Sequence, residues 1–520
     1  MQRYLYNKCI DTNNIICAIK EVNRYYGSFT AGPDNLTIKN KLDINNVVKE
    51  VKLRLRRYKK VNSKIVNITK NGKLKQTIIL NLFDRYAQQA VYRVISPILE
   101  TKMNKHSYGF RRGISVKIPV SKIANIMMKA QNTYIVEIDF EQCFKNISLN
   151  QILKCLKELG INDYHLLITI KHLMWISKEY NGIGLKSGTI LGPLLCNCYL
   201  HQLDQFIEHT FEINNHDNHR QRDYRTHTNN WIEWLNKRNK KIECRYYRYA
   251  HTAIILTTIK SEQTYIWSKI ENFINNKMEI DITSVKNKFR QNKTDFLGFH
   301  LFKGITGSTW IKIQDEQSIY NEIKKIKITS HKNIYQFKRF FIKILNYFDI
   351  VNNMGDLLSK IETYLFYQCR KGYIKQVKGI ENNIFQTSKH EIIDIWKMRR
   401  DTKDSFKTYL INSFWLKERE YLIDYEINAN EWYIYKWTLF TKQKGKDAIT
   451  NKYLKANNCV IHHIKPKKLG GTDDITNLIL ISSETHKKLH YDTEEILKQD
   501  PNFKSYAKYR KHLLLSNNMN

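Results

Sequence analysis

Acidic side chains are scarce in this sequence. The 520 residues contain 49 Asp and Glu against 86 Lys and Arg, which gives a formal net charge of +37 and a pI of about 9.6. A charge excess this large attracts polyanions, and nucleic acid is the first candidate partner. The frequent Lys, Asn, Ile and Tyr residues also fit an AT-rich genome, and this second explanation is compatible with the first.

Two further absences concern cysteine pairs and long apolar runs. No CxxC pair occurs, so a four-cysteine zinc site has no ligands, and the nine scattered cysteines are typical of reduced thiols in an intracellular protein. No apolar run approaches the roughly 20 residues that a membrane span needs. The N-terminal stretch MQRYLYNKCIDTNN has neither an apolar signal core nor transit-peptide character. We therefore expect no membrane partner, and a protein that acts in the compartment where it is made.

Residues 245–256 (RYYRYAHTAIIL) predict a strand, a turn and a second strand. Aromatic and β-branched runs flank a short polar break at residues 249–252. Polymerases carry two carboxylates at a turn of this kind, where they bind metal, whereas this turn has His251 and Thr252. Another predicted strand, residues 134–139, is apolar and ends in the acid Asp139.

Several short sequence blocks around this turn are informative because of the order in which they occur. They are DRYAQQAV (84–91), SYGFRRG (107–113), the strand ending at Asp139 with CFKNIS after it, GPLLCNCYLHQLD (192–204), RYAHT (248–252) and FLGFH (296–300). In this order they resemble the reverse-transcriptase domain of group II intron-encoded proteins, over about residues 30–310. The resemblance implies an α+β multidomain protein in which residues 1–310 form the fingers and palm of a right-hand fold.

We expect the helix that opens at Gly192 to end near Asp204, and FLGFH to lie on a strand. Between them, residues 208–243 are polar and aperiodic and predict an insertion. The histidines in this insertion are irregularly spaced, which favours a solvated loop over a metal site: His209, His216, His219 and His227.

The resemblance also exposes a loss at the polymerase site. Members of the family supply one aspartate from the strand, matched by Asp139, and two from the hairpin, which fall at His251 and Thr252. Polymerase chemistry needs two Mg²⁺ ions about 4 Å apart with oxygen ligands, and one carboxylate cannot hold two dications. Glu137 shares the strand face of Asp139 but brings no acid beside His251. We therefore predict a degenerate site without RNA-directed DNA polymerase activity, and an active reverse transcriptase is the third hypothesis.

Residues 311–440 predict a helical domain. Apolar residues recur at helical spacing between residues 331 and 373, and basic residues share the segment. This part resembles the maturase-specific domain X, the thumb equivalent, which in that family binds intron RNA; a generic basic helical bundle is the alternative. We also expect a DNA-binding region within residues 311–440. Residues 380–440 contain a Trp/Tyr-rich stretch suited to base stacking or to core packing. The RNA-binding candidates of the whole chain are Arg54, Arg56, Arg57, Arg111, Arg112, Lys338, Arg339 and Lys371.

After an expected linker at residues 441–451, a group of histidines points to a metal centre. His486 and His490 share a helix face and can hold one ion together, and His462 can add a third ligand from a strand. A divalent ion held in this way keeps open positions for a phosphate oxygen. His463, on the opposite strand face, could deprotonate a water, and Asn477 could orient its ring.

This pattern resembles the HNH (ββα-metal) nuclease domain, over about residues 455–495. The resemblance implies that His463 is the general base, that His462, His486 and His490 belong to the metal site, and that Asn477 orients the base. The acid that often precedes the histidine pair is absent, and so are the flanking cysteines, with Thr485 at one such position. A surface hairpin and helix that merely carry histidines is the alternative.

The sequence thus predicts three parts: residues 1–310, 311–440 and 441–520. We expect a group II intron maturase that binds its host intron RNA and assists splicing, and whose HNH domain uses Mg²⁺, Mn²⁺ or Zn²⁺ to cut target DNA for intron mobility. We also expect an organelle-encoded protein of a plastid or mitochondrion, with a dimer as one option for its assembly. The alternative is a DNA homing endonuclease with a vestigial RNA-binding domain.

Overall fold

The computed structural model describes most of the three predicted parts. Arg57, Arg112, most of the predicted insertion and most of residues 380–440 lie outside the described residues. The described residues are 4–24, 26–38, 40, 42–56, 62–70, 73–111, 114–142, 147–175, 185, 188–213, 243–278, 280–304, 307–326, 331–371, 375–378, 383–386, 392–393, 395, 398, 436, 439–440, 443, 445–454, 458–472, 475–507 and 509–510.

The N-terminal part is a helical layer with a long hairpin. Helices α1 (Tyr4–Ile10), α2 (Thr12–Arg24) and α3 (Ile44–Arg56) pack against α4 (Leu82–Lys102), with a 3-10 turn at Tyr26–Phe29. Apolar residues three and four apart give α3 a buried face, formed by Val47, Val48, Val51 and Leu55. The hairpin consists of β1 (Ser63–Lys70) and β2 (Lys73–Leu80), which pair in antiparallel register.

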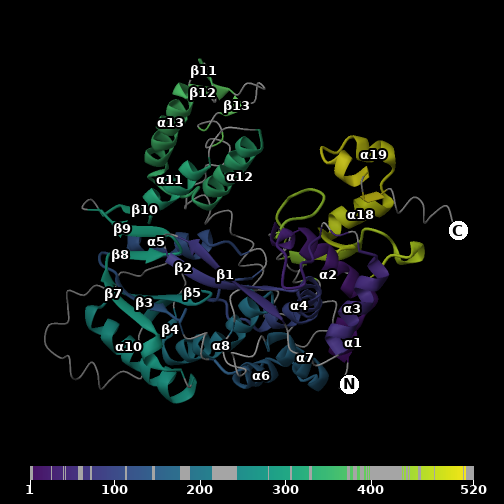
Figure 1. The fold of residues 1–520 in the computed structure, drawn as a ribbon, viewed down its shortest axis with the longest axis horizontal. Coiled ribbons are helices and arrows are strands. Elements are labelled where there is room, and N and C mark those ends of the chain that lie inside the picture. Colours follow the sequence, from purple (N-terminus) through teal and green to yellow (C-terminus); the bar gives the residue numbers. More distant parts are fainter. Residues whose placement is uncertain are drawn as a thin grey trace.

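The central part is a five-stranded sheet with the order β4-β5-β6-β3-β7. Its strands are β3 (Tyr134–Asp139), β4 (Glu212–Ile213), β5 (Glu243–Tyr249), β6 (Thr252–Thr257) and β7 (Lys286–Gln291), and only β4 and β5 run parallel. Helices α8 (Gly192–Thr210) and α10 (Lys260–Phe273) lie on one side of the sheet with α6 (Leu149–Glu158) and α7 (Tyr164–Met174), while α5 (Lys117–Lys129) lies on the other (Figure 1). Two short turns, Ile274–Met278 and Ile282–Ser284, connect α10 to β7.

This sheet separates two apolar cores. Val136 and Ile138 of β3 face the core that contains α8 and α10, whereas Ile135 faces the core that contains α5. The same alternation along β6 sends Ile255 to the first core and Ile254 to the second. Because both faces are buried, a register shift of one residue would exchange the two sets, so the hairpin register is strongly specified.

The predicted hairpin at residues 245–256 is confirmed, but two neighbouring predictions are wrong. FLGFH does not lie on one strand: β8 (Lys293–Phe296) and β9 (Phe299–Lys303) are joined by a turn in which Leu297 and Gly298 both have positive φ, as two-residue hairpins require. Helix α8 continues to Thr210 because Ile207 and Phe211 extend its buried face, and β4 follows at once. The described start of the predicted insertion is therefore regular structure.

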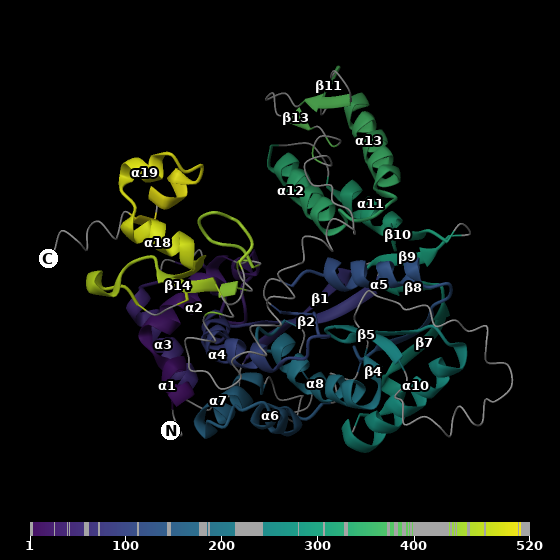
Figure 2. The same cartoon turned by 180° about the vertical axis from the view of Figure 1, so that it is seen from behind.

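The helical domain predicted for residues 311–440 is present where it is described. After β10 (Thr309–Ile313), which pairs with β9, come α11 (Glu316–Lys325), α12 (His331–Tyr347) and α13 (Met354–Arg370). Phe337, Phe341, Leu357 and Leu365 are buried between these helices. Three short strands follow, namely β11 (Lys375–Lys378), β12 (Asn383–Gln386) and β13 (Ile392–Ile393), and the whole domain stands above the palm (Figures 1 and 2).

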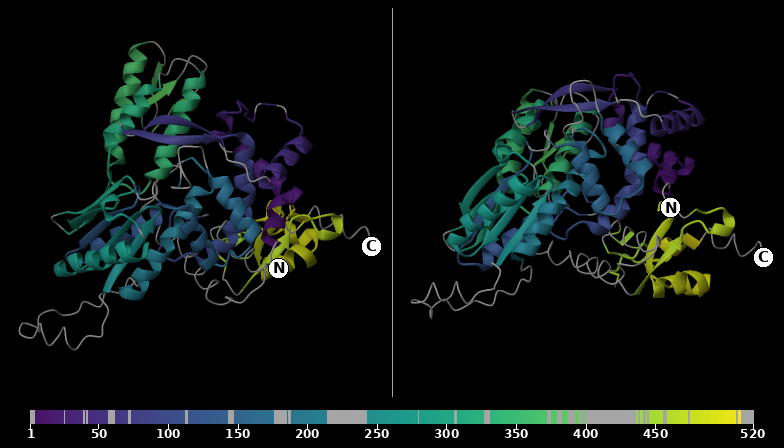
Figure 3. Two further views of the ribbon diagram at one scale, coloured as in Figure 1. Left: turned by 60° about the horizontal axis from the view of Figure 1, so that its bottom comes forward. Right: turned by 90° about the horizontal axis from the view of Figure 1, so that it is seen from below.

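The C-terminal part has a ββα arrangement. Strands β14 (Cys459–His463) and β15 (Leu478–Ser482) pair in antiparallel register, and α18 (Ser483–Tyr491) follows β15 directly, then α19 (Glu494–Lys498). A 3-10 turn at Lys467–Leu469 lies between the strands. This domain lies beside the N-terminal helices in both views of Figure 3. Among the described helices, none is both long and apolar enough to span a membrane.

The linker predicted for residues 441–451 is wrong for the residues that the structure describes there. Asp447 is buried and accepts hydrogen bonds from the backbone N–H groups of Ile449 and Ser482. The Gln443 side chain donates to the carbonyl of Leu480 (2.7 Å) and accepts from its N–H (2.8 Å). This segment therefore belongs to the ββα domain and closes one edge of β15.

Candidate metal centre and the polymerase-like palm

The palm brings the three predicted polymerase positions together. Asp139 on β3 lies directly opposite Thr252 on β6, and His251 precedes Thr252 at the hairpin turn. The backbone N–H of Phe140 donates to the carbonyl of His251 (2.9 Å), which fixes the strand end against the turn. Asp139 accepts a hydrogen bond from the N–H of Glu141 (2.8 Å). Asp139 thus contributes the carboxylate among these three positions, beside an imidazole and a hydroxyl.

Glu137 cannot replace the missing acids. Its carboxylate accepts hydrogen bonds from Thr294 Oγ1 (2.8 Å) and from the N–H of Asp295 (3.3 Å), and it lies 3.7 Å from the guanidinium of Arg290. These contacts hold the side chain at β8, away from the hairpin turn.

A buried ion pair that the sequence analysis missed supports the hairpin from beneath. Arg248 and Asp204 are both fully buried, and Arg248 donates to both carboxylate oxygens of Asp204 at 2.7 and 2.6 Å. Tyr246 also donates to Asp204 (2.7 Å). Although burial alone would lower the pKa of Arg248, the adjacent Asp204 carboxylate raises it above its usual value, so the guanidinium stays charged.

The ion pair of Arg248 and Asp204, called the hub below, also contacts the other sequence blocks. Arg248 donates to Asn197 Oδ1 (2.9 Å) and Ser107 Oγ (2.7 Å), so RYAHT, GPLLCNCYLHQLD and SYGFRRG meet at one side chain. Gly109 is required there, because a Cβ at this position would lie 2.2 Å from the backbone nitrogen of Ala250. The opposite charges of Arg248, which opens RYAHT, and Asp204, which ends GPLLCNCYLHQLD, were the available signal for this ion pair.

Arg111 is not available to RNA, so its prediction as an RNA-binding residue is wrong. Its side chain is 1% exposed and donates to Glu100 Oε1 (2.6 Å) and to the carbonyls of Asn104 (2.8 Å) and Ser107 (2.6 Å). The tight glycine-containing turn folds this arginine inward, where it neutralises Glu100 and satisfies backbone carbonyls.

The other RNA-binding candidates within the described residues are accessible to solvent. Arg56, Arg339 and Lys371 are exposed, and Lys371 lies 4.7 Å from the centre of the Tyr367 ring. Lys338 is half-buried on α12, and Arg54 is half-exposed and paired with the buried Asp84 at 3.2 Å. Their role in RNA binding stays a prediction.

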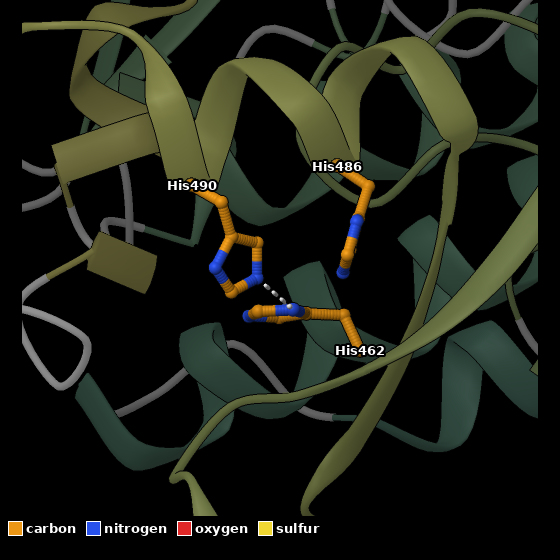
Figure 4. A group of neighbouring side chains, drawn as sticks. All are labelled: His462, His486 and His490. Carbon is orange, nitrogen blue, oxygen red and sulfur yellow. Dashed lines mark hydrogen bonds between the residues drawn. The ribbon is translucent and has the colours of Figure 1, made fainter. Parts of the chain in front are cut away.

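The three predicted metal ligands converge in the C-terminal domain. His462 projects from β14 toward His486 and His490 on α18 (Figure 4). One ring nitrogen of each lies within 4.8 Å of the others, and His490 Nε2 is 3.4 Å from His462 Nδ1. The geometry follows from local sequence: β15 pairs with β14 and passes directly into α18, which Ser482 caps by accepting from the N–H of Thr485 (3.0 Å).

The electrostatics of this triad suit a cation. Burial, reinforced by the neighbouring histidines, lowers the pKa of His462 to about 3, and burial also lowers the pKa values of His486 and His490. The rings are therefore neutral at physiological pH and offer lone pairs, as metal ligands must.

His463 and Asn477 flank this centre. His463 is half-buried next to His462, and successive strand residues point to opposite faces. The side-chain hydrogen bonds of Asn477 go to the loop backbone: it accepts from the N–H of Lys465 (2.9 Å) and donates to the carbonyls of Lys465 (3.0 Å) and Thr472 (2.9 Å). The predicted direct bond to the His463 ring is not formed, so Asn477 would position His463 through the backbone that follows it.

The loop between the two strands is closed tightly. A Cβ at Gly471 would lie 1.8 Å from the carbonyl oxygen of Lys465, so only glycine fits there. Gly471 thus has a steric reason, which is the same loop closure that Asn477 completes.

Two parts of the chain match known families. Residues 58–301 match the profile described as reverse transcriptase (RNA-dependent DNA polymerase), and residues 445–492 match the HNH endonuclease profile. The second match includes residues 445–451, which the structure also assigns to the ββα domain. The chain therefore combines a reverse-transcriptase-like domain with a C-terminal HNH domain.

Several known proteins with similar sequences are named as intron products. The COX1/OXI3 intron 1 and intron 2 proteins of Saccharomyces cerevisiae are 26% and 22% identical over 223 and 212 residues, in each case 39% of this chain and 26% and 24% of the relative. The group II intron-encoded protein LtrA of Lactococcus lactis is 26% identical over 275 residues, 45% of both chains. This chain thus spans less than half the length of each of these relatives. Among solved structures, an apo telomerase from Candida tropicalis aligns over 46% of this chain and 53% of that one, with 12% identity and a TM-score of 0.31.

Proposed function

We propose that this chain, a group II intron-encoded protein with reverse-transcriptase-like and HNH domains, is an intron maturase that carries a metal-dependent DNA endonuclease. The observation that supports the nuclease proposal is the convergence of His462, His486 and His490, since one ring nitrogen of each lies within 4.8 Å of the others. The observation that supports the maturase proposal is a reverse-transcriptase-like fold in which Asp139 lies opposite Thr252, so that one carboxylate stands where polymerases hold three.

In the proposed nuclease, His462, His486 and His490 hold the divalent ion. When bound, the ion supplies positive charge to a phosphate oxygen of the target DNA. Three imidazole nitrogens suit Zn²⁺ or another transition metal better than Mg²⁺, which prefers oxygen ligands. His463 takes the proton of the attacking water, and Asn477 keeps the backbone after His463 in place.

In the proposed maturase function, the chain binds structured intron RNA and leaves the splicing chemistry to that RNA. Exposed basic residues on α3, α12 and α13 contribute phosphate contacts, with Arg56, Arg339 and Lys371 as the leading candidates. DNA synthesis is absent in this proposal, because Asp139 alone cannot hold two dications.

The proposed setting is an organelle. Two of the relatives are products of yeast COX1 introns, which favours the mitochondrion over the plastid. The host intron RNA and the target DNA are the proposed partners, and a dimer is one option for the assembly.

The test uses purified full-length protein, the host intron precursor RNA and an intronless target DNA. We expect faster splicing with protein than without it, and nicking of the DNA only when a divalent ion is present. The competing function, a homing endonuclease with a vestigial RNA-binding part, predicts nicking with no change in the splicing rate, and that result would overturn the maturase proposal.

A further inference from the structure

The small sheet β8–β9–β10 has one buried face and one open face. Phe299 and Leu301 of β9 and Ile311 and Ile313 of β10 are buried against α5 and the helical domain. Strand alternation sends the residues between them to the opposite face. That face carries an aromatic strip, which we define as His300, Phe302 and Trp310 with the flanking Lys293 and Lys312. It lies at the margin of the molecule, at the base of the helical domain (Figure 1).

The strand register places the members of the aromatic strip side by side. Phe302 is paired across the sheet with Trp310 on β10 and with Lys293 on β8. His300 is paired with Lys312 in the same way, and its ring centre lies 5.3 Å from that of Phe302. Lys312 Nζ lies 5.3 Å from the centre of the Phe302 ring. Aromatic rings thus form the middle of the strip, and lysines stand at two of its corners.

The rings are held in place rather than loosely exposed. Trp310 is 42% exposed, and its Nε1 donates to Ser308 Oγ (3.1 Å). Gly304 lets the indole approach, since a Cβ there would lie 3.2 Å from Nε1. The acid nearest to the strip, Asp295, is occupied by His300, whose Nδ1 lies 2.6 Å from its carboxylate. A fixed, partly exposed ring loses little conformational entropy when a ligand stacks on it.

We propose that the aromatic strip is a platform for single-stranded RNA, on which unpaired bases stack against Phe302 and Trp310 while Lys293 and Lys312 contact the flanking phosphates. Sheet-borne aromatic rings bind unpaired bases in this manner, and stacking tolerates any base. The lysines at the strip and the net charge of +37 favour a polyanion over a protein partner. The inference rests on the proposed maturase function and adds that an unpaired segment of the intron RNA binds here.

The experiment uses the full-length protein and a fluorescein-labelled single-stranded RNA of about 12 nucleotides, within the length range that single-strand-binding domains cover. Photocrosslinking of a 4-thiouridine version, followed by peptide mapping, identifies the contacted residues. We expect crosslinks on β9 and β10. In the double variant F302A/W310A these crosslinks should disappear and Kd should rise by at least about tenfold, since stacking on each ring contributes roughly that factor or more.

Two further variants separate stacking from damage to the fold. The double variant F302Y/W310F keeps both rings and should bind like the wild type. Y265A removes an exposed ring that lies beside Lys269 on α10, at 5.3 Å, and should leave Kd unchanged. Replacing Lys312 by Gln should reduce the log–log salt slope of binding by about 0.7, the value for one phosphate on a single strand.

Either of two results would overturn the platform: equal binding of the oligonucleotide by F302A/W310A and wild type, or equal competition by duplex RNA. The first result would reassign the face to a protein partner. Binding of the host intron RNA is measured in parallel. If the wild type binds the intron RNA and the strip variants bind the oligonucleotide as the wild type does, only the platform is rejected. If the wild type fails to bind the intron RNA, the maturase proposal itself is overturned.

Discussion

At the residue scale, the proposed nuclease mechanism assigns metal binding and proton transfer to neighbouring residues. His462 belongs to the triad and His463 does not, although the two are adjacent on β14. Their different roles can therefore be separated by single substitutions.

We predict that H463A and H490A fail for different reasons. H463A should lower the nicking rate by about 10²–10⁴-fold, the usual contribution of general acid–base catalysis, and should keep the metal affinity of the wild type. H490A should weaken metal binding by more than about 100-fold, because it removes a ligand, and nicking should fall with it. Calorimetric titration with Zn²⁺ and Mn²⁺ beside a nicking assay measures both. Equal metal affinity in H490A and wild type would contradict the assigned ligand set.

Asn477 should act as a positioning residue. N477A removes the three hydrogen bonds that close the loop after His463 and should lower nicking by about 10–100-fold while metal affinity stays within a few-fold of wild type. A pH profile of nicking supplies the discriminating readout, because it reports on the group that takes the proton of the attacking water. An unaltered profile and rate would show that the loop needs no such clamp.

The buried pair beneath the hairpin makes a prediction about stability. D204N leaves the charge of Arg248 buried without its partner and should cost about 3–5 kcal/mol of unfolding free energy. The matched control is E322Q, which breaks the exposed pair with Lys325 and should cost less than about 1 kcal/mol. Thermal melting followed by circular dichroism compares them, and similar melting temperatures would exclude a structural role for the hub.

At the element scale, patterns that one segment carries alone were predictable from the sequence. The hairpin at 245–256, the strand ending at Asp139 and the pairing of a histidine strand with a histidine helix all follow from local periodicity. The end of α8 and the turn inside FLGFH were not predictable, because each depends on a buried contact or on backbone torsions that no spacing reveals. The inward turn of Arg111 belongs to the same class, since its partner Glu100 lies on another element.

The segment at residues 445–451 shows how a polar stretch can be structural. D447A would leave the N–H groups of Ile449, Thr450 and Ser482 without their acceptor, and we expect a loss of about 1–3 kcal/mol in the ββα domain. E495A, an exposed change in α19 of the same domain, is the control and should cost less than about 1 kcal/mol. Metal-dependent thermal shifts report on this domain separately, and equal shifts for both variants would argue that residues 445–451 are a linker after all.

At the scale of the whole molecule, RNA binding should be electrostatic and independent of the nuclease. The log of the affinity for intron RNA should fall linearly with the log of the salt concentration, with a slope of about −0.7 to −0.9 for each phosphate neutralised. The wild-type protein should extend no primer with either Mg²⁺ or Mn²⁺, and H463A should still accelerate splicing. A salt-independent affinity would reject the electrostatic account, and primer extension would reject the loss of polymerase activity.

The hub formed by Arg248 and Asp204 has a consequence for the history of this protein. The residues that shape the hairpin are distinct from those that would bind metal, so mutational drift at positions 251 and 252 could remove the acids without unfolding the palm. A site with His251 and Thr252 also lacks the mutual repulsion that clustered carboxylates have without metal. One acid introduced at either position would bring part of that repulsion and, in the two-metal scheme, no catalysis. Under the proposed function, polymerase activity is therefore easier to lose than to regain.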